Sequence, residues 1–132
     1  MVAYSFNKRF VAPILDGTKI GTIRKQRKRH ARAAEWVQLY TGMRTKYCAR
    51  IGSGVCQSAR PIILSLDDAG VFYRDAMESI RDADDLDAFA VADGFADWDH
   101  LDAFWRVSHP GVAVFEGTHI VWGYTFAPAE TC

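Results

Sequence analysis

The segment Gly17–Arg24, with the sequence GTKIGTIR, constrains the fold more than any other part of the chain. Gly17 follows an apolar stretch, and it can adopt the positive φ that ends a helix and turns the chain. Polar and apolar residues then alternate, with Thr22 and Arg24 on one side, which is typical of a strand with a polar face. Together with Lys19, this face offers an amine, a hydroxyl and a guanidinium to one ligand. The segment therefore predicts a helix, a turn and a strand that bind an anionic or hydrogen-bonding ligand, and a nucleotide fits best.

A run of basic residues, KQRKRHAR at positions 25–32, follows directly, and we call it the basic segment. The whole-chain balance of 16 Lys and Arg against 16 Asp and Glu hides its charge. Residues 1–60 carry 13 basic and two acidic side chains, a formal charge of +11. Residues 61–132 carry three basic and 14 acidic side chains, a formal charge of −11. This asymmetry predicts a polyanion-binding face opposite an acidic face. The alternative is that the two halves pack together and neutralise each other.

Seven side chains are candidates for contact with nucleic acid. Six of them are cations that we expect to bind phosphates, namely Arg24, Lys25, Arg27, Lys28, Arg29 and Arg32. Aromatic side chains among basic residues can stack on bases, and Trp36, Tyr40 and Tyr47 occupy such positions. Tyr40 is our candidate for this role.

Length and composition favour one folded domain over residues 1–132. No apolar stretch approaches the ~20 residues of a membrane span and no signal peptide is recognisable, so we expect no membrane partner. Cys48, Cys56 and Cys132 lack CxxC spacing, which favours free thiols in a reducing cytoplasm over structural zinc. The four histidines form no ligand pair, and a glycine-rich phosphate loop is lacking. We therefore expect neither a metal nor another cofactor.

Short extended segments recur along the chain and outnumber the helices. They are predicted at residues 3–6, 22–24, 36–40, 45–51, 55–58, 61–66, 71–73, 112–115 and 120–126. Gly52-Ser53-Gly54 is expected to break one pair as a hairpin turn or a bulge, and Glu116-Gly117-Thr118 is expected to join the last pair. We expect five or six of these short strands, with few helices, to form a small β-barrel.

Three helices complete the predicted α+β fold. Asn7 can cap a short N-terminal helix on which Ile14 is apolar. A second helix begins with the acidic residues at 82–85, which suit the positive end of the helix dipole, and Gly94 ends it. Asp97 can cap a third helix, which His109-Pro110-Gly111 closes. We expect the last two helices to lie together at one end of the barrel.

Two stretches resemble the motifs of a known family. Residues 10–24, from Phe10 through the GTKIGTIR segment, resemble the signature of ASCH domains, which belong to the PUA-like superfamily. Residues 89–98, FAVADGFADW, resemble the second motif of these domains. The resemblance implies a PUA-like β-barrel with helices at one end and a cleft lined by both motifs. It also implies binding of RNA or modified nucleosides.

Within this family the chain resembles the small N4-acetylcytidine amidohydrolases. Their lysine base matches Lys19, their threonine nucleophile matches Thr22, and their acidic proton donor, usually glutamate, falls at Asp93. The residue chemistry is compatible, because a hydroxyl needs a base and a lysine base needs an amine that desolvation or nearby cations have neutralised. In a purely binding site, Lys19 and Arg24 stay charged and bind phosphates. Asp93 can also be a buried structural partner of either cation.

The sequence thus predicts an RNA- or nucleoside-binding domain with a basic cleft. One alternative is a small hydrolase that cleaves N4-acetylcytidine or the RNA backbone, which requires Lys19, Thr22 and Asp93 in one pocket. Another is a protein-interaction module, which requires exposed apolar surface on the helices that contain Trp98 and Trp105.

Overall fold

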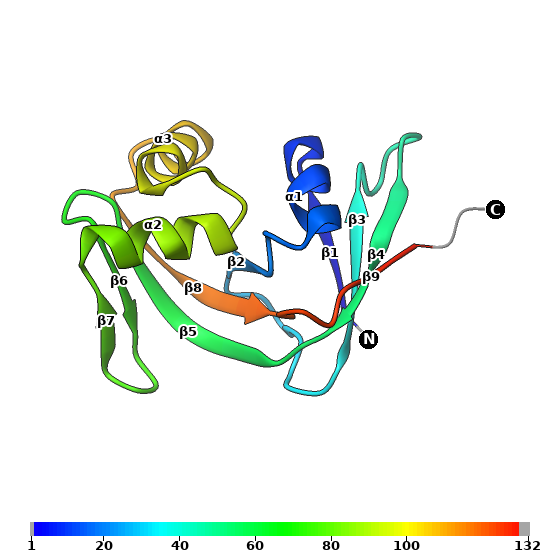
Figure 1. The fold of residues 1–132 in the computed structure, drawn as a ribbon, viewed down its shortest axis with the longest axis horizontal. Helices are drawn as coiled ribbons and strands as arrows, with labels where there is room; N and C mark the ends of the chain where they lie inside the picture. The colour runs from blue at the N-terminus through cyan, green and yellow to red at the C-terminus, as the bar shows by residue number, and fades with distance from the viewer. Residues whose placement is uncertain (1, 130–132) are drawn as a thin grey trace.

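The computed structural model describes residues 2–129, which form an α+β fold (Figure 1). Its elements in chain order are β1 (Val2–Phe6), the 3-10 helix η1 (Lys8–Phe10), α1 (Val11–Asp16), β2 (Gly21–Lys25), β3 (Trp36–Thr41), β4 (Ala49–Val55), β5 (Ser58–Ser65), β6 (Gly70–Tyr73), β7 (Glu78–Ile80), α2 (Ala83–Ala92), α3 (Trp98–Ser108), β8 (Val114–Val121) and β9 (Ala127–Pro128). No helix in this part of the chain is long and apolar enough to cross a membrane. Cys48 is an exposed and Cys56 a buried free thiol, whereas Cys132 lies outside the described residues.

The strands form two sheets, in the orders β1-β3-β4-β9 and β2-β8-β5-β6-β7. Only β1 and β3 pair in parallel among the described strands. The predicted α+β fold is confirmed, but the strands over residues 2–129 number nine rather than five or six, and they form two sheets without a closed barrel. The edge strands β1 and β2 do not pair with each other, and a side chain bridges them instead. Arg24 on β2 donates from Nη2 to the backbone oxygen of Ser5 on β1, at 2.7 Å.

Two predicted turns are instead parts of continuous strands. Gly52-Ser53-Gly54 lies inside β4, and residues 116–118 lie inside β8. The pairing register shifts beside Gly52, since Leu39 pairs with Gly52 and Tyr40 with Arg50, which agrees with a bulge rather than a hairpin turn. Strand β8 pairs with β2 on one side and β5 on the other, so its position within the sheet outweighs the local turn signal. A Cβ at Gly117 would clash with the backbone oxygen of Arg24, so this glycine allows β2 to lie close. The predicted strand at 120–126 ends at residue 121, and the short strands β7 and β9 were not predicted.

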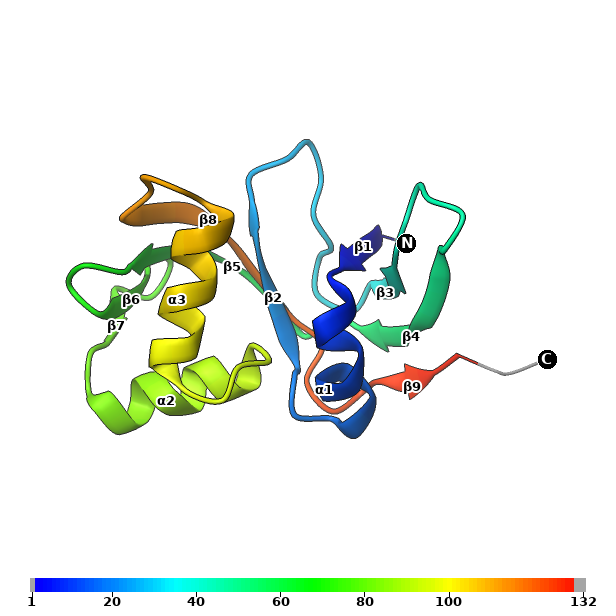
Figure 2. The same ribbon diagram turned by 90° about the horizontal axis from the view of Figure 1, so that it is seen from above.

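The predicted helices are present, and their ends follow the expected chemistry. Asp82 and Asp97 cap α2 and α3 by accepting backbone N–H groups through their side chains. Gly17 ends α1 with a φ of 85°, and Gly94 follows α2 with a φ of 99°. Asn7 caps η1 rather than α1. Figures 1 and 2 show α2 and α3 together on one side of β2 and α1 on the other side.

The core joins both sheets and all helices, and burial of each of its Val, Leu, Ile and Phe side chains contributes roughly 1.5–3 kcal/mol. Trp98 and Trp105 belong to this core and are 8% and 6% exposed. Neither tryptophan is exposed, although Val107 on the same helix α3 is exposed, so the protein-interaction hypothesis stays a prediction.

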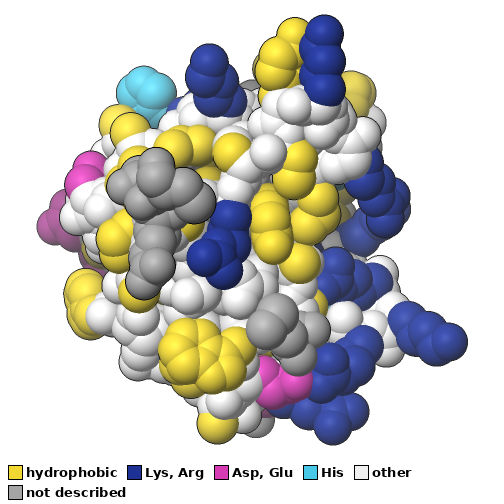
Figure 3. All heavy atoms as spheres, turned by 90° about the vertical axis from the view of Figure 1, so that its right-hand side faces the viewer, with side chains coloured by type: hydrophobic (Ala, Val, Ile, Leu, Met, Phe, Trp, Pro, Cys, Tyr) yellow, Lys and Arg dark blue, Asp and Glu magenta, His cyan; other side chains and the backbone are white. Residues whose placement is uncertain are grey.

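Opposite charges are largely separated in space. The basic first half of the chain supplies β1, β3 and β4, and Figure 3 shows Lys and Arg gathered along one side of that end, where Asp and Glu are sparse. Among residues 2–129, only two first-half cations form ion pairs with second-half acids. Lys19 pairs with Asp93, and Arg60 pairs with Asp75 and Glu78. Mutual neutralisation of the two halves is thus limited to these contacts.

Candidate functional site

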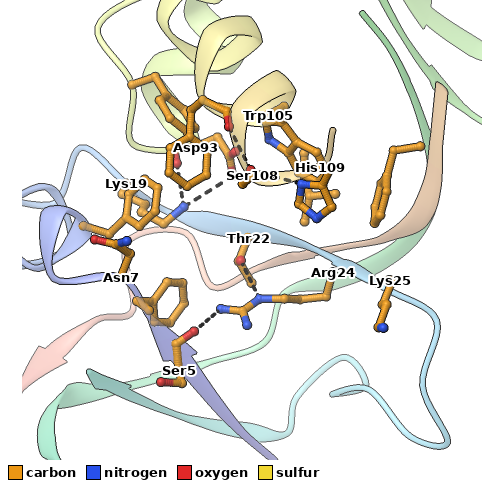
Figure 4. A pocket seen from close by; sticks show the side chains of 16 residues that line it. Ser5, Asn7, Lys19, Thr22, Arg24, Lys25, Asp93, Trp105, Ser108 and His109 are labelled. Atoms are coloured by element: carbon orange, nitrogen blue, oxygen red, sulfur yellow. Dashed lines mark hydrogen bonds and ion pairs between the residues drawn. The ribbon is translucent and has the colours of Figure 1, made fainter. Parts of the chain in front are cut away.

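Three polar side chains are buried in the described part of the chain, and they are Lys19, Thr22 and Asp93, which are 3%, 4% and 5% exposed. All three line one cavity of about 350 Å³, which we call the pocket. In Figure 4 Lys19 points toward Asp93, while Thr22 and Arg24 extend from β2 toward the same space. Burying polar groups costs free energy unless they are paired. Their concentration in one cavity therefore marks it as the candidate site.

Backbone contacts bring the two sequence motifs together. Lys19 lies in the turn between α1 and β2, and Asp93 is the C-terminal cap of α2. The N–H of Ile20 donates to the backbone oxygen of Ala92 at 2.9 Å, which joins the start of β2 to the end of α2. A Cβ at Gly94 would lie 2.8 Å from Cδ of Lys19. Glycine at this position therefore gives the lysine stem its space.

The Lys19 amine is enclosed by Asp93 and aromatic rings. Nζ donates to the backbone oxygen of Asp93 at 2.5 Å and lies 3.4 Å from Oδ1 of its carboxylate. The ring centroid of Phe10 is 4.7 Å from Nζ. Burial lowers the pKa of Lys19 against the opposing charge of Asp93, and Arg24 lowers it further. Burial likewise raises the pKa of Asp93, against the charge of Lys19.

Arg24 fixes the position of the Thr22 hydroxyl. Its Nε donates to Thr22 Oγ1 at 3.0 Å, and its guanidinium lies 4.8 Å from the Phe6 ring centroid. Among the described residues no hydrogen bond joins Thr22 to Lys19. Because Thr22 Oγ1 accepts from Arg24, its own proton remains available for donation to a ligand or a base.

The opposite wall of the pocket comes from Phe95 of the second motif and from residues of α3 that the sequence did not identify as part of a site. Phe95, Phe104 and Trp105 line it, together with Ser108 and His109 at the end of α3. Ser108 Oγ and His109 Nδ1 are 3.0 Å apart. The sequence marked His109 only as a helix end, and no local signal pointed it toward β2.

Tyr4 organises the basic segment. Its hydroxyl lies 3.0 Å from Nδ1 of His30 and accepts the N–H of Ala31 at 3.1 Å. The guanidinium of Arg27 lies 4.7 Å from the centroid of its ring. Burial raises the pKa of Tyr4 and lowers that of His30, which keeps both groups neutral near pH 7. This buried tyrosine thus anchors an exposed cationic loop.

The predicted nucleic-acid contacts fall into three locations. Arg24 and Lys25 line the pocket. A second hollow of about 390 Å³ includes the other four cations, Arg27, Lys28, Arg29 and Arg32. Tyr40 is half-buried on β3 and lines neither cavity. Within residues 2–129 no three His, Cys, Asp or Glu side chains come together as a metal site would require.

No protein-family model matches the chain, and no curated protein matches it. Solved structures do match. The crystal structure of ASCH from Zymomonas mobilis aligns over 93% of the chain, with a TM-score of 0.53 and 14% sequence identity. The chain has the ASCH fold. A crystal structure of a mutant ASCH protein from Zymomonas mobilis aligns equally far, with a TM-score of 0.52 and 13% identity. The chain covers 66% and 68% of the lengths of these two chains. At such identities the comparison extends to the ASCH fold alone.

Proposed function

We propose that this protein binds RNA through the basic segment and places one nucleoside of the strand in the pocket. The observation that carries the proposal is the course of β2. This strand passes from the buried end of the pocket, at Thr22, to Arg24 and Lys25 at its wall, and then directly into the basic segment. A ligand that occupies the pocket can therefore continue along a row of cations.

The pocket suits a nucleoside in size and chemistry. Small-molecule sites enclose roughly 300–1,000 Å³ and combine apolar walls with a few polar groups. Aromatic side chains form much of this wall, and bases stack favourably on such rings. The Asp93 carboxylate can accept hydrogen bonds from a base or ribose, and Lys19 and Thr22 can donate them.

The basic segment contains cations that are free to bind phosphates. Arg29 is engaged with Glu35, and Arg27 donates to the backbone oxygen of Arg29 at 3.0 Å. Lys28 and Arg32 are exposed, and their side chains form no hydrogen bond or ion pair within residues 2–129. We therefore expect these two side chains to contribute most to phosphate binding.

Fluorescence anisotropy with labelled single-stranded RNA at several salt concentrations tests the proposal. The logarithm of affinity should fall with the logarithm of salt concentration at about −0.7 per phosphate neutralised. The double variant Lys28→Ala/Arg32→Ala should flatten that slope by about 1.4. Arg74→Ala/Arg81→Ala removes two exposed arginines near β6 and β7 and should leave the slope unchanged. Salt-independent binding, or equal effects of the two double variants, would contradict the proposed interface.

The buried lysine favours hydrolysis of N4-acetylcytidine as a second candidate function. A lowered pKa increases the neutral fraction of the Lys19 amine, which can then take the proton of Thr22. Thr22 Oγ1 would attack the acetyl carbonyl, Lys19 would pass the proton to the leaving N4 of cytidine as the carbon–nitrogen bond breaks, and water would release acetate from the threonine ester. The Arg24 guanidinium beside Oγ1 would stabilise the developing negative charge.

Incubation with N4-acetylcytidine, followed by chromatography of the products, tests this candidate. Thr22→Ala should abolish deacetylation, and Lys19→Arg should lower kcat by about 10²- to 10⁴-fold because a guanidinium keeps its proton. Thr18→Ala is the matched control, since Thr18 is exposed and hydrogen-bonds Asp16 outside the pocket. Deacetylation that survives in Lys19→Arg would exclude this lysine as the base.

A further inference from the structure

Arg9 lies beside the pocket and has no assigned role in either candidate function. Its guanidinium carbon is 5.2 Å from the ring centroid of Phe10, and it is 5.0 Å from the centroids of both Phe95 and Phe104. All three rings line the pocket. Arg9 belongs to η1, whereas Phe95 and Phe104 come from the α2–α3 region. Its guanidinium therefore contacts rings from both sides of the pocket.

The donor groups of Arg9 are unused. The side chain is exposed, and its guanidinium forms no hydrogen bond or ion pair with any residue of the described chain. By contrast, the guanidinium of Arg24 donates two hydrogen bonds and that of Arg60 pairs with carboxylates. Contacts with aromatic rings position a guanidinium without occupying its five N–H donors. Arg9 therefore presents a restrained and unpaired cation beside three rings that line the pocket.

Such a group matches the chemistry of a phosphate. A restrained planar guanidinium can donate two parallel hydrogen bonds to phosphate oxygens, and it loses little conformational freedom on doing so. The charge of Arg9 also contributes to lowering the pKa of Lys19, so its field extends to the buried end of the pocket. An anionic group of a ligand near Arg9 would offset the positive charges of both Arg9 and Lys19.

We propose that Arg9 binds the phosphate of a nucleotide in the pocket, so that the preferred ligand carries a phosphate next to the bound nucleoside. This assignment rests on the proposed function and specifies its ligand. The phosphate can belong to a free nucleoside monophosphate or to the phosphodiester of an RNA strand. Both sources offer the same anionic oxygens to the guanidinium.

Isothermal titration calorimetry with cytidine, cytidine 5′-monophosphate, cytidine 3′-monophosphate and the dinucleotide CpC distinguishes these sources. At least one phosphate-bearing probe should bind about 10- to 100-fold more tightly than cytidine, as expected for charge-assisted hydrogen bonds. A free monophosphate as the tightest ligand indicates a nucleotide site, and CpC as the tightest ligand indicates a strand site. If no phosphate-bearing probe binds better than cytidine, the assignment of Arg9 is overturned while the proposed function stands.

Variants separate a phosphate contact from a structural role. Arg9→Met retains an apolar stem over the rings, and it should remove the preference for phosphate while leaving cytidine affinity unchanged. Lys8→Ala removes an exposed cation one residue away and should preserve the preference. A preference that survives in Arg9→Met, or an equal loss of affinity for cytidine and its phosphates, overturns the assignment. If none of the probes binds to the native protein, the proposed function fails as well.

Discussion

Removing one charge from the Lys19–Asp93 pair should destabilise the protein, with a pH dependence whose sign depends on which partner is removed. Asp93→Asn retains the backbone oxygen that accepts from Nζ but leaves the buried amine without an opposing charge. The buried amine can instead lose its proton. For a lysine with the ordinary pKa of 10.5 this costs about 5 kcal/mol at pH 7, which is the upper limit of the loss of unfolding free energy. In Lys19→Met the buried Asp93 carboxyl can gain a proton. With its ordinary pKa of 3.8 this costs about 4 kcal/mol at pH 7, which is the upper limit of the loss of unfolding free energy. We expect each variant to lose about 3–4 kcal/mol of unfolding free energy.

The two variants differ in proton binding. In Asp93→Asn burial keeps the pKa of Lys19 lower in the folded than in the unfolded protein, so the unfolded state binds more protons. The stability of this variant should therefore rise with pH until the pH passes the ordinary pKa of lysine. In Lys19→Met burial keeps the folded-state pKa of Asp93 above its unfolded value. Stability is then greatest below the unfolded pKa and is lost as pH rises through the folded pKa.

Urea unfolding, followed by fluorescence of the buried tryptophans from about pH 5 to about pH 9, measures both slopes. The neutral double variant Lys19→Met/Asp93→Asn should recover most of the loss, because the cost of a broken buried pair comes from the remaining charge. Asp102→Asn is the control, since Asp102 forms an exposed pair with Arg106 and its removal should change little. Slopes of the same sign, or a double variant as unstable as the single variants, would refute the reasoning.

Two further substitutions test how the site is supported. Gly94→Ala should cost more than Gly111→Ala, since both glycines have a positive φ but a Cβ at Gly94 would also meet the side chains of Lys19 and Phe10. Equal urea midpoints for the two variants would show that contact with the lysine stem is unimportant. Tyr4→Phe removes the acceptor of a buried backbone N–H and should lower the unfolding free energy by about 1–3 kcal/mol, with faster amide exchange in the basic segment. An unchanged exchange rate would mean that another contact anchors the segment.

Local features of the site were predictable because they depend on a few neighbouring residues. Gly17 adopts the positive φ expected of a helix end, and Asp97 caps the helix that follows it. The alternation of Thr22 and Arg24 correctly indicated a strand. These signals act through sterics and hydrogen bonds within one turn or strand, so the sequence contains them directly.

The same local rules failed where neighbouring strands decide the conformation. Gly52-Ser53-Gly54 has the composition of a turn, and Gly117 was expected in another. Both lie in strands, because pairing with adjacent strands satisfies the backbone hydrogen bonds that a turn would otherwise satisfy. The predicted barrel is not closed either, since β1 and β2 are edges of different sheets that the Arg24 side chain bridges without backbone pairing.

The sequence alone determined the local elements of this protein, the charge difference between its halves and the resemblance that joins Lys19 to a motif some 70 residues away. Only the tertiary structure placed Lys19 and Asp93 within 3.4 Å, buried both and brought the pocket wall from α3 opposite β2. It also placed Arg9 against rings from both sides of the cleft. Burial and the shifts in pKa that follow from it depend on every group that surrounds a charge in space. Those surroundings come from distant parts of the chain, and no local sequence pattern encodes them.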